Sequence, residues 1–286
     1  MFEELAATTS DGVRLRIDHV HAIGAVRGAI VCLHAMMTDG RYFGARRDGF
    51  AQALARLGYH VLVADFRGHG DSVPPRAGTD DWSFDDLVTK DLPAIVRTAA
   101  HATDLPPDDL ILLGHSLGGL VATAALGTGK IMQPRALLLP ATAVWLTGPD
   151  GSTRRRALMA AYRGLTALFG RAPVRAVGAG TADEARTYVK QLTSWAKSAS
   201  WTSLAGLDYS AALAAIETPV IPLVGASDWM CTVEDARGFA GRIPTAKPVR
   251  IVGTRYGDAL DPDHFQLFTR PELRPVWSEV LGKHLC

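Results

Sequence analysis

Residues Leu110–Gly119 read LILLGHSLGG, and this stretch decides the fold of the chain. Its first four residues form a short apolar run that is typical of a buried strand. The run that follows it, Leu120–Leu126, is typical of a helix. A strand, a tight G-x-S-x-G turn and a helix in this order predict that the turn presents Ser116 as a nucleophile.

The glycines beside Ser116 have a physical reason. A sharp strand-to-helix turn needs close backbone approach, and Gly114 and Gly118 carry no side chain that would clash there. The turn also places Ser116 at a helix N-terminus, where free N–H groups favour developing negative charge. The alternative is a glycine-rich turn with an incidental serine, and the two flanking elements favour the nucleophile.

Composition excludes several classes of protein. The chain has 286 residues, 48% of them hydrophobic, which suits one large domain or a domain with an insertion. Its 30 basic and 29 acidic residues give a net charge of +1, so nothing indicates a nucleic-acid partner. The one cationic cluster, 154–156, is interpreted as a solvated helix face.

The sequence gives no reason to expect a targeting signal. No signal peptide is evident at the N-terminus, and no run of about 18 apolar residues predicts a membrane-spanning helix. The three cysteines, Cys32, Cys231 and Cys286, form an odd and sparse set that is typical of a reducing compartment. We therefore expect a cytoplasmic protein without stable membrane insertion.

Apolar strand patterns alternate with helical patterns along most of the chain. This order predicts an α/β fold whose mostly parallel sheet is covered by helices on both faces, with an antiparallel edge from an opening hairpin. Pro222 lies inside one strand and predicts a missing hydrogen bond there. The predicted strands are 3–8, 13–19, 29–33, 60–64, 110–113, 135–139, 220–225 and 248–252, and the predicted helices include 48–57, 82–100 with a kink at Pro93, and 271–285.

The pattern changes between Trp145 and Leu213, where apolar residues recur at helical spacing. We interpret 145–213 as a helical cap insertion, with 1–144 and 214–286 forming the core domain. The two apolar rows either line a pocket for an apolar substrate or pack the core of the insertion itself. They comprise Leu158, Tyr162 and Leu165, and Tyr188, Leu192 and Trp195.

Two further motifs extend the pattern around Ser116. Residues 65–72 read DFRGHGDS, and residues 33–36 read LHAM. Together with the turn at 114–119, which matches the nucleophile elbow of that family, these motifs resemble the α/β-hydrolase superfamily. The resemblance covers nearly the full length of the chain and is to a serine esterase or lipase-like member. The resemblance implies an eight-stranded sheet, a helical cap and a catalytic triad in the order serine, acid, histidine. Asp65 and Arg67 are interpreted as structural.

The resemblance also nominates the partners of Ser116. The family places its acid just past the strand that follows the cap, which favours Asp228 over Asp150, and its histidine in the loop before the last helix, which is His264. His264 would take the serine proton, and Asp228 would orient the ring. His34, His69, His115 and His284 lie in other positions and are not expected to act.

An oxyanion hole needs two backbone donors. The Leu117 N–H is the first, because it follows the nucleophile, and the family's placement makes the Met36 N–H the second. The chain has Ala35 where the family usually has glycine, so the second donor is less firmly assigned than the first.

These residues predict a serine hydrolase that cleaves a carboxylic ester through an acyl-enzyme. Thioesters, lactones and amides share the chemistry, and no metal or organic cofactor is expected. The expected partner is a small, apolar acyl substrate. Two alternatives stay open: a triad-dependent lyase or acyltransferase in secondary metabolism, and a non-catalytic ligand-binding homologue.

Overall fold

The structure is a computed structural model that describes residues 1–72, 81–146 and 153–285. At its centre is an eight-stranded sheet in the order β1-β2-β4-β3-β5-β6-β9-β10. The β1–β2 and β2–β4 pairs are antiparallel, and all other neighbours are parallel, which confirms the predicted class and edge. The strands are β1 (Phe2–Thr8), β2 (Arg14–Val20), β3 (Gly28–Leu33), β4 (Tyr59–Ala64), β5 (Leu110–Gly114), β6 (Ala136–Pro140), β9 (Val220–Gly225) and β10 (Arg250–Val252).

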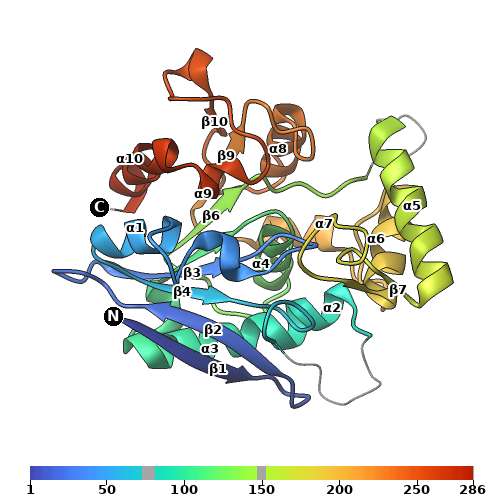
Figure 1. Ribbon diagram of the computed structural model, residues 1–286, viewed down its shortest axis with the longest axis horizontal. Coiled ribbons are helices and arrows are strands. Elements are labelled where there is room, and N and C mark those ends of the chain that lie inside the picture. Colours follow the sequence, from blue (N-terminus) through green and yellow to red (C-terminus); the bar gives the residue numbers. More distant parts are fainter. Residues whose placement is uncertain (73–80, 147–152, 286) are drawn as a thin grey trace.

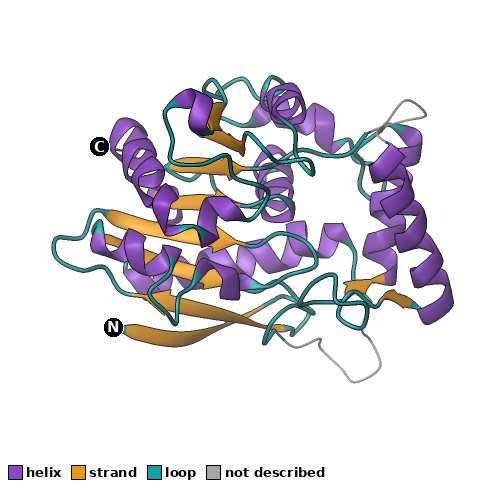
Figure 2. Cartoon of the chain, turned by 45° about the horizontal axis from the view of Figure 1, so that its top comes forward, coloured by secondary structure: helices purple, strands orange, loops and turns teal. Residues whose placement is uncertain are grey.

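Helices cover both faces of this sheet (Figure 2). One apolar cluster joins the strands to α3 (Leu92–Thr103) and α4 (Leu117–Gly127), and a second joins them to α1 (Phe50–Arg56) and α10 (Arg274–Leu285). The central strands are buried along their length, because a parallel sheet is enclosed between two helical layers. The shorter helices are α2 (Phe84–Asp86), α7 (Tyr209–Ala212), α8 (Val233–Ala240) and α9 (Gln266–Thr269).

Several helices begin later than predicted. The chain is extended at Gly49, so α1 starts at Phe50, and Pro271–Leu273 forms a 3-10 turn, so α10 starts at Arg274. No helix within the three described ranges has the length and apolar character needed to cross a membrane.

The kink expected at Pro93 takes the form of a π-helical turn at Leu87–Asp91, between α2 and α3. In this turn the Leu92 N–H donates to the Leu87 carbonyl, five residues earlier. Pro93 directly follows this turn, in the first turn of α3, and proline has no N–H to donate to the preceding helical turn.

Strand β9 runs through Pro222 without a break. The irregularity appears instead in the pairing with β10, where an isolated bridge joins Val220 to Ala246 and the ladder resumes only at Leu223. Val220 hydrogen-bonds to this side, and Pro222 faces the same side two residues later. The missing proline N–H therefore coincides with the gap in the ladder.

The segment between β6 and β9 forms a helical layer beyond the carboxyl ends of the parallel strands, far from both chain termini (Figure 1). It contains α5 (Thr153–Phe169), α6 (Arg186–Ser198) and a small antiparallel pair, β7 (Arg171–Ala172) with β8 (Glu184–Ala185). We call this layer the cap. The domain limits 1–144, 145–213 and 214–286 stay a prediction.

Candidate active site

Ser116 occupies the turn between β5 and α4 with φ 51° and ψ −109°, a conformation that non-glycine residues rarely adopt. A Cβ at Gly114 would lie 2.6 Å from the Gly119 Cα, and one at Gly118 would lie 2.4 Å from the Leu33 carbonyl oxygen. The glycines are therefore required by space, as the sequence predicted.

Asp228 and His264 meet behind this turn. The Nδ1 atom of His264 lies 2.7 Å from Oδ2 of Asp228, and both residues are buried. The other carboxylate oxygen of Asp228 accepts hydrogen bonds from the Met230 and Cys231 N–H groups, at 2.8 and 2.9 Å. The carboxylate is thus held from both sides and directs one oxygen at the imidazole ring.

The loops that carry Asp228 and His264 are packed directly against each other. The Ser227 N–H donates to the Pro262 carbonyl at 3.2 Å. A Cβ at Gly225, where β9 ends, would lie 2.2 Å from the same oxygen. Glycine at this position lets the two loops approach, which brings residues 36 positions apart into contact.

Ser116 and His264 line one narrow pocket of about 40 Å³, together with Met36 and Leu117. The structure therefore gathers four of the five predicted site residues at one cavity, and Asp228 contacts His264 from behind. Asp150, the alternative acid, lies outside the described residues.

The two expected oxyanion donors are unoccupied. In the described part of the chain, neither the Leu117 N–H nor the Met36 N–H has a hydrogen-bond acceptor. Ala35, which stands where the family usually has glycine, is accommodated: it is buried, and its N–H donates to the Tyr42 hydroxyl at 3.2 Å. Met37 adopts a positive φ of 62°.

The cap holds the loop that contains Met36, and sequence patterns gave no signal for this contact. The Met37 N–H donates to the carboxylate of Glu184, from β8, across 147 positions of sequence. The Met37 carbonyl accepts from the N–H groups of Thr181 and Ala182 at 2.9 and 3.2 Å. Both peptide groups of a strained residue are thus fixed by the cap.

Glu184 is fully buried and also faces His69, with 3.4 Å between its Oε1 and the ring Nε2. Burial lowers the pKa of His69, but the Glu184 carboxylate, the Arg67 carbonyl and Asp65 together hold that pKa above its ordinary value. The pair joins the DFRGHGDS loop to the cap.

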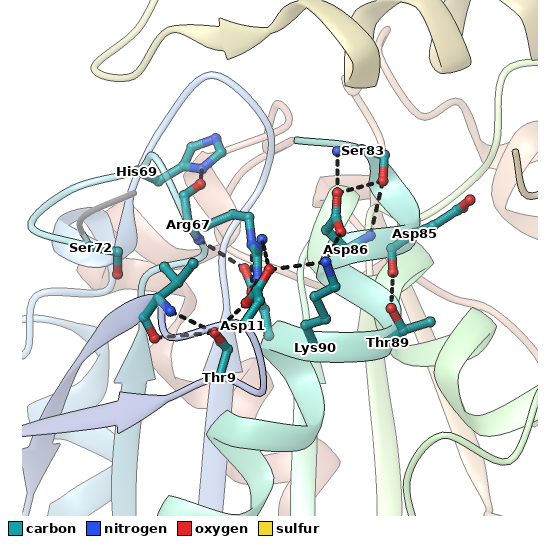
Figure 3. Close-up of polar contacts among 12 residues, drawn as sticks. Thr9, Asp11, Arg67, His69, Ser72, Ser83, Asp85, Asp86, Thr89 and Lys90 are labelled. Atoms are coloured by element: carbon teal, nitrogen blue, oxygen red, sulfur yellow. Dashed lines mark hydrogen bonds and ion pairs between the residues drawn. The ribbon is translucent and has the colours of Figure 1, made fainter. Parts of the chain in front are cut away.

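The same loop is anchored on its other side by Arg67 (Figure 3). The Arg67 guanidinium binds the buried Asp91 at 2.7 Å and Asp11 at 2.9 Å, and Lys90 also reaches Asp11. Asp65 accepts from the Gly40 N–H at 2.7 Å. These contacts confirm the structural interpretation of Asp65 and Arg67.

The remaining histidines near the site have structural contacts. His34 accepts a hydrogen bond from the Phe66 N–H at 3.1 Å, and His115 lies 2.7 Å from the Tyr42 hydroxyl. Burial holds the pKa of both imidazoles well below its ordinary value. Their rings are therefore neutral packing groups beside the elbow.

The cysteines offer no second nucleophile among the described residues. Cys231 lines the pocket, and burial, followed by the nearby Asp228 carboxylate, raises the pKa of its thiol well above the ordinary value. Burial does the same for Cys32. Cys286 lies outside the described residues.

The interpretation of the cationic cluster 154–156 as a solvated face is wrong for its central residue. Arg155 is buried and forms an ion pair with Asp235 of α8, and it also donates to the Trp229 and Met230 carbonyls. Arg154 lies over the Trp229 ring, 3.5 Å from its centroid. Arg154 and Arg155 thus connect the cap to the loop that follows Asp228. A run of like charges in the sequence does not predict these contacts.

The apolar rows of the cap divide between the two expected roles. Tyr188 and Leu192 line the pocket of Ser116, whereas Trp195 packs against Phe84 and Trp201 in the core. An adjoining apolar pocket of about 580 Å³ shares Met36 and Met230 with the first. Its lining includes the whole first row, Leu158, Tyr162 and Leu165.

A larger polar cleft of about 720 Å³ lies between the DFRGHGDS loop and the cap, with Arg41, Asp71 and Arg175 in its wall. None of the five predicted site residues lines it. We assign the candidate site to the smaller pocket because Ser116 and His264 line it, and not because of its size.

Comparisons with known proteins agree with this fold. A family described as "Serine aminopeptidase, S33" matches residues 24–253. Lipase lipl-1 of Caenorhabditis elegans is 34% identical over 90 residues, which are 29% of this chain and 22% of the lipase. The chain spans less than half the length of the curated relatives it matches.

Two solved structures show the breadth of the fold. The esterase EaEST from Exiguobacterium antarcticum has a TM-score of 0.65 at 17% identity, and a bromoperoxidase from Bacillus anthracis has 0.63 at 15%; each match covers 99% of both chains. At these identities the likeness shows the fold alone. Since the family match covers most of the chain, from β3 to β10 and including Ser116 and Asp228, the chain belongs to the serine aminopeptidase S33 family of the α/β-hydrolase superfamily.

Proposed function

We propose that the protein is a serine hydrolase that cleaves carboxylic esters. Ser116 is the nucleophile, His264 is the general base and Asp228 orients it. The observation that carries the proposal is the 2.7 Å contact between His264 and Asp228, with His264 lining the same pocket as a serine on a strained turn.

The proposed reaction has two halves. His264 takes the proton of the Ser116 hydroxyl as its oxygen attacks the ester carbonyl, and it returns that proton to the departing alcohol. Water then attacks the acyl carbon as His264 takes one of its protons, and His264 gives that proton to the Ser116 oxygen as the acyl bond breaks and the acid leaves. The Asp228 carboxylate stabilises the charged imidazolium in both halves.

The negative charge on the carbonyl oxygen needs donors at the same pocket. The N–H groups of Leu117 and Met36 are unpaired among the described residues and border the cavity that Ser116 lines. Each such donor contributes roughly 3–4 kcal/mol to transition-state stabilisation. The Leu117 N–H also lies at the first turn of α4, where the helix dipole adds to this effect.

The adjoining pocket indicates the substrate class. Its walls combine aliphatic and aromatic side chains with two methionines at the junction to Ser116, so it suits an apolar acyl or alcohol group. Methionine side chains adapt their shape to such groups. We therefore propose an apolar ester substrate.

The same lining favours an ester over an amino-terminal peptide. An aminopeptidase must bind the substrate's free ammonium group, and a buried cation needs a carboxylate partner. Among the residues described as lining these two pockets, none is an aspartate or glutamate. An uncharged ester meets no such penalty.

Fluorophosphonate labelling with peptide mapping tests the nucleophile directly. We expect one label on Ser116, and loss of both label and turnover of p-nitrophenyl esters in Ser116→Ala. Ser278→Ala, on the exposed side of α10, is the matched control and should keep full activity. Folded protein that hydrolyses esters at the wild-type rate without Ser116 would overturn the proposal.

A substrate series tests the specificity. We expect kcat/KM for p-nitrophenyl esters to rise from acetate to medium-chain acyl groups, and aminoacyl p-nitroanilides to react far more slowly. Faster turnover of the anilides would favour a peptidase.

A further inference from the structure

Three histidines gather at the opposite end of the sheet from Ser116. His19 lies in β2, His21 follows the end of that strand, and His60 is near the start of β4. One ring nitrogen from each lies within 4.8 Å of the others. The parallel strands end at the edge that carries Ser116, so the amino-terminal start of β4 places this cluster away from the reacting groups.

Strand register explains why these side chains meet. His19 and His21 are two residues apart, so they point to the same face of the sheet. The antiparallel pairing sets Glu3 of β1 opposite His19 on one side and Leu62 of β4 opposite it on the other. Continued by two residues, the β2–β4 register sets His60 opposite His21.

The distances among these groups are those of potential ligands. His19 Nε2 lies 3.0 Å from His60 Nδ1, and the rings of His19 and His21 stack with centroids 4.1 Å apart. Glu3 Oε2 lies 3.5 Å from His21 Nε2 and 3.8 Å from His19 Nδ1. A carboxylate oxygen thus approaches the same cluster.

One nitrogen of this cluster makes no hydrogen bond within the part of the chain that the structure describes. It is Nδ1 of the fully buried His19, which Glu3 approaches only to 3.8 Å. Leaving a buried polar atom without a hydrogen bond is unfavourable. A bound group that contacts the cluster would therefore stabilise it.

We propose that His19, His21 and His60 bind one zinc ion, with Glu3 completing the site. Ring nitrogens about 2.0–2.1 Å from a tetrahedral zinc ion lie roughly 3.4 Å apart, and one ring nitrogen of each histidine lies within 4.8 Å of the others here. His21 and Glu3 are partly exposed, so their side chains are free to close the remaining distance. Imidazole ligands suit zinc, whereas magnesium and calcium require oxygen.

The site would be structural. It joins β1, β2 and β4, the antiparallel edge of the sheet, and an ion that binds only the folded chain stabilises it. It is independent of the proposed hydrolase reaction, and zinc should change the melting temperature without changing kcat.

Calorimetry on untagged, chelator-treated protein tests the proposal. We expect one equivalent of zinc chloride to bind and to raise Tm, and magnesium chloride to do neither. His21→Asn and His60→Asn should each weaken zinc binding by at least about 100-fold, since even the loss of a group behind a ligand lowers affinity roughly 10–100-fold. His101→Asn, an exposed histidine of α3, is the matched control and should bind as the wild type does.

Cobalt(II) supplies a second readout that does not depend on stability. Tetrahedral nitrogen coordination should give intense visible absorption in the wild type and in His101→Asn, but not in His21→Asn. His21 is partly exposed and lies outside β2, so this variant should fold. Equal zinc affinity in wild type and His21→Asn, or no binding by the wild type, would overturn the proposal.

Discussion

The Nδ1 atom of His264 lies 2.7 Å from Oδ2 of Asp228, and Oδ1 of the same carboxylate accepts two backbone N–H groups. Asp228→Asn should preserve these backbone contacts while removing the negative charge that stabilises the imidazolium. We expect kcat to fall on the order of 10³–10⁴-fold with little change in Tm. Steady-state kinetics on an activated ester and thermal unfolding measure the two effects.

Two aspartates serve as controls for that variant. Asp263 caps the loop next to His264, and Asp263→Asn keeps its acceptor oxygen, so activity should remain near the wild-type level. Asp150→Asn tests the alternative acid. A larger rate loss in Asp150→Asn than in Asp228→Asn would reassign the acid.

Glu184 is expected to act as a positioning residue for the oxyanion loop. Glu184→Ala removes the acceptor of the Met37 N–H, so the neighbouring Met36 donor should lose its fixed orientation. We expect kcat to fall about 10–100-fold, less than the roughly 10²–10³-fold for outright removal of one oxyanion donor, with a smaller change in KM.

Glu184→Gln separates this role from general stability. Glutamine keeps the acceptor oxygen, so it should restore most of kcat, although the contact with His69 loses its charge. Asp183→Asn, at the neighbouring position, should leave kcat unchanged. Equal kcat losses in Glu184→Gln and Glu184→Ala would contradict the positioning role.

Arg155 should contribute to stability through three acceptors. Arg155→Ala leaves Asp235 without its ion-pair partner and two carbonyls without a donor. We expect about 1–3 kcal/mol of destabilisation, less than for a fully buried pair because Asp235 is partly exposed. Urea unfolding measures the change. Arg163→Ala, exposed on the same helix, should shift stability by less than about 0.5 kcal/mol.

Two glycines offer opposite outcomes for the same substitution. Gly118→Ala places a Cβ 2.4 Å from the Leu33 carbonyl oxygen, and overpacking of this kind typically costs about 1–3 kcal/mol. Gly164→Ala meets open space inside α5 and should stabilise the helix by about 0.5–1 kcal/mol. Unfolding midpoints that move in the same direction for both variants would contradict this contrast.

Acid should destabilise the metal-free protein through His19. Its pKa is about 4 in the folded chain against 6.5 ordinarily, so the unfolded chain binds more protons between these values. Stability should therefore fall as pH decreases from about 6.5 toward 4. Urea midpoints measured in chelator across this range should show a shallower pH slope for His19→Gln than for the wild type, and an unchanged slope for His101→Gln.

Short apolar runs in the sequence predicted the strands, and the order of strand, turn and helix predicted Ser116 at the end of β5. The resemblance to the α/β-hydrolase superfamily then nominated Asp228 and His264, in the loops that follow β9 and β10. The carboxyl ends of parallel strands meet at one edge, so these loops can approach the turn of Ser116. Arg155 and Glu184 were not foreseen in these roles, because their partners lie 80 and 147 positions away. Local charge patterns carry no information about contacts at that separation.

The histidine cluster was missed for a related reason. His19 and His21 are close in sequence, but His60 joins them only through the register of an antiparallel pair. An error of one residue in that register would turn His60 to the opposite face. Its detection therefore required the sheet itself.

The hydrogen bonds between Met37 and residues 181, 182 and 184 of the cap matter for engineering this protein. An exchange of the cap for that of a relative, made to admit a different substrate, would also remove the groups that fix a strained peptide beside the pocket of Ser116. A transplanted cap has to bring a carboxylate and two amide donors to the same place. We therefore expect an exchange of the cap to change substrate selectivity and the rate of turnover together.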